Sequence, residues 1–538
     1  MSFFSLCNCL FVYLQKYWGT PSASINNIKL YNIKTNNTMK NHPVGRYCVC
    51  LTALVSAAEM QAATENTVRK PNVIFIVADD IGYGDLSCYG EQTVNTPNVD
   101  ALAASGILFT DAHATASTST PSRYSLFTGC YNWRRNDTGI APGDAAMIIR
   151  PDQHTIADLF REKGYTTGAI GKWHLGLGDK RGEQDWNGTI TPGLKDIGFD
   201  YSCIMAATAD RVPCVWIENS RIANYDPSAP VYVSYKENFP GEPTGKDNPE
   251  LMTKLRPSVG HNQSIVNGIP RIGYMKGGGK ALWKDENIAD TISAKAVGFI
   301  QKNSNRPFFL YVGTNDIHVP RYPHPRFQGK SPMGLRGDAI LQFDWTVSTI
   351  VQALKEAGIY ENTLIVLTSD NGPVVDDGYQ DRAAELLGKH RPWGNLRGTK
   401  YSIYEAGTRV PFIVSWPSQV KAGVSPALVS HIDLYASMAA LIDTQKPAGA
   451  ASDSRNQLAA LLGKNQKGRE YIIESSGTLA VSTGEWKYIP GRNGGKKQVP
   501  AQLYHLKEDI GEKKNVADKY PEKVKELDAI LQKEKNRK

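Results

Sequence analysis

Cysteine is scarce in this chain, and its few cysteines do not have the spacing of a metal site. The 538 residues include eight cysteines. Half of them fall within the first 50 residues, at Cys7, Cys9, Cys48 and Cys50. The others lie far apart, at Cys88, Cys130, Cys203 and Cys214. This spacing matches no thiolate zinc site. An oxidising compartment would permit a disulfide between the last two, but we expect buried free thiols there.

The sequence also lacks a strong net charge, an internal repeat and any long apolar run after its N-terminal segment. Its net charge of +8 is mild for this length. Such a charge permits attraction to anionic substrates but does not indicate nucleic-acid binding. With 41% hydrophobic and 21% charged residues, the composition is typical of a soluble globular protein with room for more than one domain. We therefore expect no nucleic-acid partner and no membrane span.

Residues 1–63 differ in composition from the rest and predict an N-terminal extension followed by a signal peptide. We expect the true start of translation at Met39. From there, Lys40 and Arg46 precede an apolar run at 47–58, which is the pattern of a secretory signal and too short to cross a bilayer. The mature protein is therefore expected to be periplasmic or secreted.

Between residues 70 and 463, apolar strand-like runs alternate with helical patterns. The runs are 73–77, 166–170, 308–312 and 363–367, and the helical patterns include 156–163, 290–302 and 343–357. Such alternation predicts a mainly parallel sheet flanked by helices, hence an α/β catalytic domain. Residues 235–285 are rich in Gly, Pro and Lys and predict long surface loops, which often form a substrate rim.

After residue 463 the pattern changes to short strands separated by turn residues. The strand-like runs are 471–474, 479–481, 486–490 and 502–505, and a charged amphipathic helix follows at 521–533. We therefore expect residues 464–538 to form a smaller C-terminal subdomain, an antiparallel sheet with one helix.

Two adjacent carboxylates, Asp79 and Asp80, come directly after the apolar run 73–77. Open α/β sheets place their ligands just beyond the carboxyl ends of the strands. Two neighbouring aspartates without a nearby basic residue repel each other, so a hard divalent cation is their natural neutraliser. A second polar pair, Asp370 and Asn371, follows the run 363–367 and should reach the same sheet edge.

The stretch Ser119-Thr120-Pro121-Ser122-Arg123 resembles the signature of the type I sulfatases, with Ser in place of the commoner Cys at the first position. The resemblance continues in order through further blocks: 171–176, 315–320, 369–372, 397–400 and 404–411. Six blocks over some 340 residues make a specific match. One departure is Ala406, which stands where the family usually has Gly. The resemblance implies the alkaline-phosphatase-like fold. Ser122 is in addition suited to cap a helix that starts at Tyr124.

The resemblance also implies cofactors and site residues. Ser119 would be oxidised to formylglycine (3-oxoalanine) by a radical-type sulfatase-maturing enzyme, because an unmodified serine hydroxyl is a poor nucleophile. Calcium would be held by Asp79, Asp80, Asp370 and Asn371. The other catalytic residues would be Arg123, Lys172, His174, His318 and Lys400. Of these, Lys172, His318 and Lys400 would bind sulfate. Lys400 or His318 could protonate the leaving oxygen, and His174 could assist deprotonation of the formylglycine hydrate.

The implied function is hydrolysis of sulfate monoesters through a formylglycine hydrate and a transient covalent sulfo-enzyme. The expected substrate is a sulfated sugar at the end of a mucin- or glycosaminoglycan-type glycan. Polar residues at 209–213 and 261–264 suit hydroxyl recognition, and salt-bridged loops are an equal alternative. A phosphate-ester hydrolase of the same superfold is a rival, but the two zinc ions of such enzymes need more histidines than His174 and His318. A non-catalytic binder of sulfated glycans is the other rival, if Ser119 is never oxidised.

Overall fold

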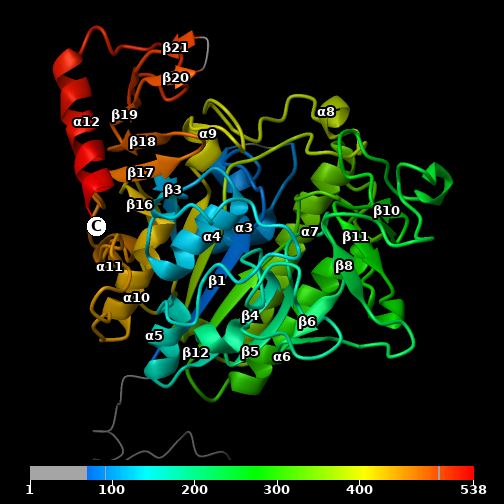
Figure 1. Cartoon of the computed structure of the whole chain (residues 1–538). Helices are drawn as coiled ribbons and strands as arrows, with labels where there is room; N and C mark the ends of the chain where they lie inside the picture. The colour runs from blue at the N-terminus through cyan, green and yellow to red at the C-terminus, as the bar shows by residue number, and fades with distance from the viewer. Residues whose placement is uncertain (1–69, 91–92, 495–496, 538) are drawn as a thin grey trace, which may run out of the picture. The chain divides into compact units, whose positions relative to one another are not determined.

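A computed structural model describes residues 70–90, 93–494 and 497–537 of the chain. The predicted extension and signal peptide at 1–63 lie outside the described residues. Figure 1 shows a large central sheet with helices on both sides and a smaller sheet near the C-terminus. The predicted α/β fold with a smaller C-terminal antiparallel sheet is confirmed. Among the described residues, no helix has both the length and the apolar character needed to cross a membrane.

The central sheet has ten strands. Their order is β15 (Gly423–Ser425), β2 (Ile107–Phe109), β14 (Phe412–Ser415), β13 (Thr363–Ser369), β1 (Asn72–Ala78), β12 (Phe308–Gly313), β4 (Thr166–Lys172), β5 (Tyr201–Met205), β6 (Trp216–Glu218) and β7 (Arg221–Ile222). The five strands from β13 to β5 are parallel. β1, β12 and β13 are buried along their whole length, as expected for parallel strands covered on both faces.

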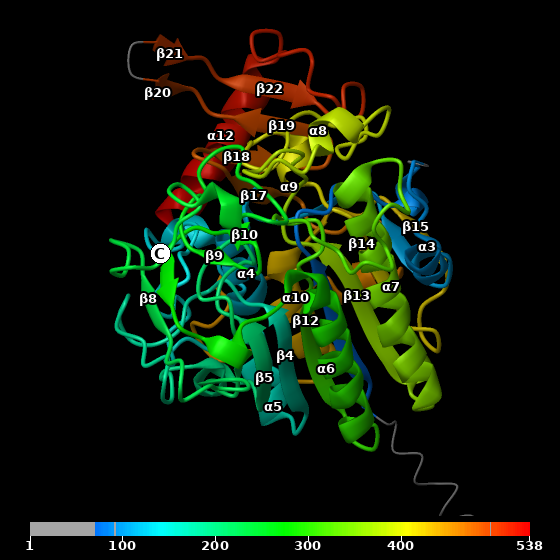
Figure 2. The ribbon, with the colours of Figure 1, turned by 90° about the vertical axis from the view of Figure 1, so that its right-hand side faces the viewer.

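Two groups of helices cover the sheet. α3 (Pro97–Ala104), α6 (Ile288–Asn303) and α7 (Gly334–Glu356) lie together on one face. α4 (Ser119–Thr128), α5 (Ile156–Glu162) and α10 (Leu434–Leu441) lie together on the other (Figures 1 and 2). α5 begins with a capping box, in which the Thr155 side chain accepts from the Asp158 backbone N–H and the Asp158 carboxylate accepts from the Thr155 N–H. Such a box satisfies two backbone donors at the helix start.

The C-terminal sheet is antiparallel and is covered by one helix. Its strands are β17 (Ile472–Ser475), β18 (Leu479–Ser482), β19 (Trp486–Ile489) and β22 (Gln502–His505), and the helix is α12 (Pro521–Asn536). Leu527 and Leu531 of the helix are buried against this sheet in an apolar cluster with Ile473, Val481 and Leu503. A separate hairpin, β20 (Arg492–Gly494) and β21 (Lys497–Val499), lies between β19 and β22 in the sequence.

The sequence predictions missed or misplaced several elements. Strands β2 and β5–β7 were not predicted, because each spans only two to five residues. The helix expected from Tyr124 begins instead at Ser119, with Thr118 as its N-cap. Ser122 therefore lies inside the helix and does not cap it. Cys203 and Cys214 are buried free thiols.

The segment 235–285 contains three short strands, β9 (Ile265–Val266), β10 (Ile269–Pro270) and β11 (Tyr274–Lys276), and two single-turn 3-10 helices at Pro249–Leu251 and Gly279–Ala281. β11 pairs with β8 (Tyr232–Ser234), which lies just before the segment, and β9 pairs with β10. These strands form two small sheets apart from the central one. The remaining residues are loops and turns, in agreement with the sequence prediction.

Candidate active site

Two polar pairs meet at the carboxyl edge of the central sheet. Asp79 and Asp80 follow β1, and Asp370 and Asn371 follow the adjacent parallel strand β13. Ala78 pairs in register with Ser369, so the two pairs leave the sheet side by side. Asn371 Nδ2 donates to Asp80 Oδ1 at 2.8 Å, and the Asp80 N–H donates to Asp370 Oδ1 at 3.4 Å. The expected meeting of these residues is therefore observed.

The start of α4 brings Ser119 to this edge. Ser119 is the first residue of the helix and is 3% exposed. Its hydroxyl donates to Asn371 Oδ1 at 3.3 Å and accepts from Lys172 Nζ at 2.7 Å. The N-terminus of a helix carries a partial positive charge, so developing negative charge at Ser119 would be stabilised by the helix as well as by Lys172.

Arg123, one turn further along α4, is fully buried and ion-paired with Asp370. Its Nε donates to Asp370 Oδ2 at 2.9 Å. Its Nη1 donates to the Tyr311 hydroxyl, which in turn donates to the Lys172 carbonyl at 3.3 Å. Burial alone would raise the pKa of Asp370, but the charges of Arg123 and Lys172 outweigh it and lower that pKa. Asp370 is therefore ionised.

Lys172, the last residue of β4, lies between Ser119 and the carboxylates. Its Nζ is 2.5 Å from Asp79 Oδ1 and 3.5 Å from Asp370 Oδ2. Burial lowers the pKa of Lys172, partly offset by the neighbouring carboxylates. Burial also raises the pKa of Asp79 to about 8, against the opposing charge of Lys172. Both shifts come from the removal of charged groups from water.

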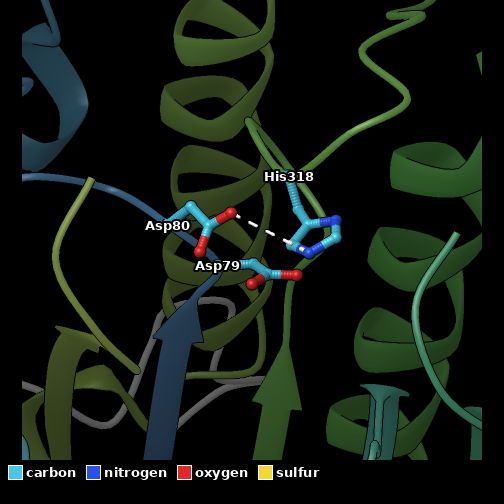
Figure 3. Close-up of side chains that lie close together, drawn as sticks. All are labelled: Asp79, Asp80 and His318. Carbon is cyan, nitrogen blue, oxygen red and sulfur yellow. Dashed lines mark ion pairs between the residues drawn. The ribbon is translucent and has the colours of Figure 1, made fainter. Parts of the chain in front are cut away.

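The donor set fits a hard divalent cation. Asp79 Oδ2 is buried and has no hydrogen-bond partner among the described residues. Asp79, Asp80, Asp370 and Asn371 all offer oxygen donors, which calcium requires. Oxygens of Asp79 and Asp80 and a ring nitrogen of His318 come within 4.8 Å of one another (Figure 3). A bound cation would supply the positive charge that Asp79 needs in order to stay ionised.

Lys400 is held by two carboxylates at the edge of the same site. Its Nζ is 2.8 Å from Asp80 Oδ2 and 3.0 Å from Asp377 Oδ2. Burial would lower the pKa of Lys400, but the charges of Asp80 and Asp377 raise it well above its ordinary value. Lys400 is therefore charged, and an oxygen of a bound ester near its Nζ would meet a proton donor.

The two histidines are neutral and expose different ring nitrogens. His318 Nδ1 donates to the Val319 carbonyl at 2.7 Å, which leaves Nε2 facing Asp80 Oδ2 at 3.9 Å (Figure 3). His174 Nε2 donates to the Ala141 carbonyl at 2.9 Å, and its buried Nδ1 has no partner among the described residues. Burial lowers the pKa of both histidines well below the ordinary value. Each therefore offers a bare nitrogen that can accept a hydrogen bond.

Ser119, His174, His318 and Lys400 line one hollow together with side chains from the loops. The additional lining residues include Asp210, Arg211, His261, Asp377 and Tyr401. A larger hollow between residues 391–399 and 508–513 contains none of the predicted site residues. The polar stretches at 209–213 and 261–264 thus reach the predicted site. Asp377 and Tyr401 were missed, because no sequence pattern marks them apart from the proximity of Tyr401 to Lys400.

His261 is a cation in this hollow. Its Nδ1 lies 2.9 Å from the Val259 carbonyl and its Nε2 lies 3.0 Å from Asp210 Oδ2. Both neighbours are acceptors, so both ring nitrogens carry protons. Burial would lower the pKa of His261, but its bond to Asp210 raises it. Arg211 pairs with the same carboxylate at 2.9 Å, so two cations share one anion at this wall.

Comparisons with known proteins agree with this geometry. The model of the sulfatase family matches residues 71–444. N-acetylgalactosamine-6-O-sulfatase of Bacteroides thetaiotaomicron is 52% identical over 500 residues, which cover 90% of this chain and 97% of that protein. Human arylsulfatase A is 31% identical over 79% of this chain and 76% of its own length.

A solved structure has the same fold and a similar sequence. It comes from work on the metabolism of multiple glycosaminoglycans by Bacteroides thetaiotaomicron and is described as a 6S-sulfatase. It has a TM-score of 0.84 and 53% sequence identity, and the match covers 87% of this chain and all of that one. The chain therefore belongs to the sulfatase family and is a sulfuric ester hydrolase.

Proposed function

We propose that this sulfatase removes a single sulfate from a sugar at the end of a glycosaminoglycan- or mucin-type glycan, with 6-O-sulfated N-acetylgalactosamine as the first candidate. The 52% identity to an N-acetylgalactosamine-6-O-sulfatase over nearly its whole length supports this sugar. The observation that carries the proposal is that Ser119 shares one hollow with Asp210, Arg211 and His261. This hollow can receive a sulfate ester and hydroxyls of the attached sugar together.

The charges that line the hollow favour a substrate with one anionic group. Arg211, His261 and Lys400 are cations, whereas Asp210 and Asp377 are anions. Among the residues that line the hollow the cations outnumber the anions by one, and one sulfate monoester would neutralise this excess. Asp80, which also contacts Lys400 at 2.8 Å, is one of the proposed calcium ligands and would be neutralised by that cation. A neighbouring uronate or a second sulfate in the hollow would have no spare cation. The hollow is walled by residues from several segments, around positions 140, 210, 261, 318, 377 and 401. A hollow walled by this many segments suits the end of a glycan chain, which supports attack there.

The nucleophile is proposed to come from Ser119. Its oxidation removes two hydrogens from the side chain, which a radical-type sulfatase-maturing enzyme would take up, and the hydrated aldehyde then offers a hydroxyl to attack sulfur. Lys172, 2.7 Å from the Ser119 oxygen, would hold that group and one sulfate oxygen. Arg123 would hold Asp370 and Lys172 in place through hydrogen bonds to the Asp370 carboxylate and the Lys172 backbone carbonyl. His174, with a bare buried Nδ1, would accept a proton from the hydrate.

Lys400 is the proposed donor of the proton to the leaving sugar oxygen. It is charged and lines the hollow, whereas the free Nε2 of His318 carries no proton. His318 would instead accept a hydrogen bond or help to bind sulfate. Calcium held by Asp79, Asp80, Asp370 and Asn371 would supply positive charge for the sulfate oxygens. We also propose a periplasmic or secreted location, on the signal pattern in the sequence.

The decisive experiment is sulfate release from a panel of defined sulfated sugars by protein matured with a radical-type maturase. The panel pairs 6-O-sulfated N-acetylgalactosamine with its 4-O-sulfated isomer, with 6-O-sulfated N-acetylglucosamine and with the corresponding 6-phosphate. Intact mass, measured in parallel, reports whether Ser119 has lost two hydrogens. We expect fastest release from the 6-O-sulfated galacto sugar. Preference for the phosphate with an unmodified Ser119 would contradict the proposal.

A further inference from the structure

Buried charged side chains gather where the central sheet, the loop after Lys400 and the C-terminal sheet meet. They come from three places: the segment around β3 (Ala112–His113), the short helix α9 (Glu405–Thr408) with the residue after it, and strands β17 and β19. The residues are Asp111, His113, Glu405, Arg409, Glu474 and Lys487. We call them the junction ring.

His113 links two carboxylates and must be charged. Its Nδ1 lies 2.7 Å from Glu474 Oε1, and its Nε2 lies 2.8 Å from Asp111 Oδ1. A neutral imidazole has only one N–H, so it could not donate to both acceptors. Burial would lower the pKa of His113, but Glu474 and Asp111 raise it to about 9. The geometry and the pKa agree on an imidazolium.

The remaining contacts close a ring of alternating charges. Lys487 Nζ lies 2.7 Å from Glu474 Oε2 and 3.0 Å from Glu405 Oε1. Arg409 Nε lies 2.6 Å from Glu405 Oε2, and its Nη1 lies 2.7 Å from Asp111 Oδ1. Passing round from Asp111, each anion therefore stands between two cations. Three negative and three positive charges cancel, which is what a buried ion cluster needs to be stable.

Glu512 borders the ring without adding a charge. Its Oε2 accepts from the Glu405 backbone N–H at 2.8 Å. Burial raises the pKa of Glu512 to about 8, with Lys487 opposing, which favours the uncharged form of its carboxyl. His113, Glu405 and Glu474 also lie close enough together to hold a metal. Lys487, which contacts both glutamates, already supplies the positive charge there.

The backbone on either side of the ring leads to the catalytic groups. The segment with His113 continues to Ser119, and the Ala114 N–H donates to the Thr408 carbonyl at 2.8 Å. The segment with Lys400 continues to Glu405, and the Tyr401 N–H donates to the Ser117 carbonyl at 3.1 Å. The ring thus holds the chain before Ser119 against the chain after Lys400.

The residues after Asp370 also join this arrangement. The Gly372 N–H donates to the Gly407 carbonyl at 2.9 Å. A Cβ atom at position 372 would lie 1.7 Å from the Ala406 carbonyl oxygen, so only glycine permits this approach. Three segments of the site therefore rest on α9, whose first residue, Glu405, belongs to the ring.

We propose that the junction ring positions Ser119 and Lys400 for the reaction, and that Lys487 is the positioning residue through which the C-terminal sheet takes part. Lys487 is the only ring member that supplies positive charge from this sheet. Its loss would leave Glu405 and Glu474 facing each other without their shared cation. Relief of that repulsion requires movement of α9, and with it the Lys400 segment. The proposal rests on the proposed roles of Ser119 and Lys400.

The test compares Lys487→Met with the double variant Glu474→Gln/Lys487→Met. The single variant leaves one excess negative charge, whereas the double variant restores balance with side chains of similar size. We expect Lys487→Met to lower kcat by about tenfold or more, because a small misplacement of reacting groups is costly. The double variant should recover to within about threefold of the native kcat. Aryl sulfate turnover is measured well below each variant's Tm, so that only folded protein contributes.

The control is a matched pair on the surface of the same subdomain. Lys507 and Glu485 are ion-paired at 2.8 Å and exposed, so Lys507→Met and Glu485→Gln/Lys507→Met should both keep native kcat. A purely structural ring would lower the Tm of Lys487→Met and leave kcat of the folded protein unchanged. That result, or a double variant no better than the single one, would overturn the proposal.

Hydrogen exchange tests positioning without any activity. In Lys487→Met, amides of residues 114–119 and 399–408 should exchange faster than in the native protein, and in the double variant they should return toward native rates. Unchanged exchange in these peptides would refute positioning even if sulfate release were lost. An inactive native protein with the expected exchange pattern would instead contradict the proposed function alone, so the two failures are distinguishable.

Discussion

The charge cluster around Ser119 and the junction ring around His113 are both buried, but they differ in how their charges are balanced. In the junction ring every anion lies between two cations. Around Ser119, the Asp79 Oδ2 and His174 Nδ1 atoms have no partner among the described residues. Buried polar atoms without partners are costly, so their presence marks the place where a cation and a substrate are expected. The balanced charges of the junction ring leave none for a ligand, which fits the proposed positioning role rather than binding.

The sharpest way to test this difference is to remove the proposed nucleophile. Ser119→Ala is expected to abolish turnover, because no oxidisable side chain would remain, while substrate binding stays measurable by calorimetry. Ser117, which is buried two residues earlier and bonded to Ser476, provides a control: Ser117→Ala should keep most activity. Turnover by Ser119→Ala above a few per cent of the native rate would contradict the proposed mechanism.

The second largest effect is expected from the two lysines of the cluster around Ser119. A charged donor aimed at the transition state in a site that excludes water contributes about 3–4 kcal/mol. Lys172→Ala and Lys400→Ala should therefore each lower kcat by about a hundredfold or more. Steady-state kinetics on one good substrate will measure this effect. Near-native turnover in both variants would show that the cations do not act on the reaction.

Metal removal should lower both stability and activity through the cluster around Ser119, whereas the junction ring should bind no calcium. We expect stoichiometric calcium in purified protein by elemental analysis, since the donors are oxygens. A chelator should lower Tm, because a ligand that binds only the folded state stabilises it. Asp370→Asn should reduce calcium content, and Glu474→Gln, in the junction ring, should not. Stoichiometric zinc without calcium would revive the phosphate-ester hydrolase as an alternative.

Changes in the loop wall of the hollow should affect recognition more than chemistry. His261→Asn and Asp210→Asn remove one partner each from a pair 3.0 Å apart. We expect KM to rise by about tenfold and kcat to stay within a few-fold, because these side chains are proposed to contact the sugar rather than the reacting atoms. Kinetics on the sugar substrate and on a simple aryl sulfate should diverge. An equal loss on both substrates would place these residues in the chemistry.

The smallest effect is a pH dependence of stability that comes from the junction ring. The pKa of His113 is raised to about 9 in the folded protein, above its ordinary value of about 6.5. Its stabilising contribution is therefore complete below about pH 6.5 and is lost as the pH rises through about 9. The raised pKa of Glu512, about 8, adds a change of the same sign.

Denaturant unfolding between pH 6.5 and 9 measures this slope. His113→Asn should be less stable than the native protein but should lose less stability over this range. His505→Asn, on the partly exposed side of the C-terminal sheet, should keep the native slope. A His113 variant whose slope equals that of the native protein would show that His113 is not charged in the ring.

Much of the fold follows from local sequence patterns. The buried strands β1, β4, β12 and β13 were predicted because continuous apolar runs between helical patterns are typical of parallel strands covered on both faces. Strands β2, β5, β6 and β7 were not, because two to five residues carry too weak a pattern. The pairing of β2 depends in addition on β14, which lies far along the chain. The start of α4 was placed five residues too late because Ser122 was interpreted as its cap. Pro121 lies in the first turn of the helix, where proline is tolerated.

The sequence by itself determined which residues gather near Ser119, because the carboxyl ends of parallel strands must share one edge of the sheet. It therefore predicted that Asp79, Asp80, Asp370 and Asn371 lie together. The resemblance to the sulfatases added Lys172 and Lys400 and implied that both bind sulfate. Only the tertiary structure decided protonation and pairing. The charge on His113, the bare nitrogens of His174 and His318, and the pairing of Lys400 with Asp377 all depend on distances of about 3 Å between atoms far apart in the chain. Such distances are set by packing, and no local pattern encodes them.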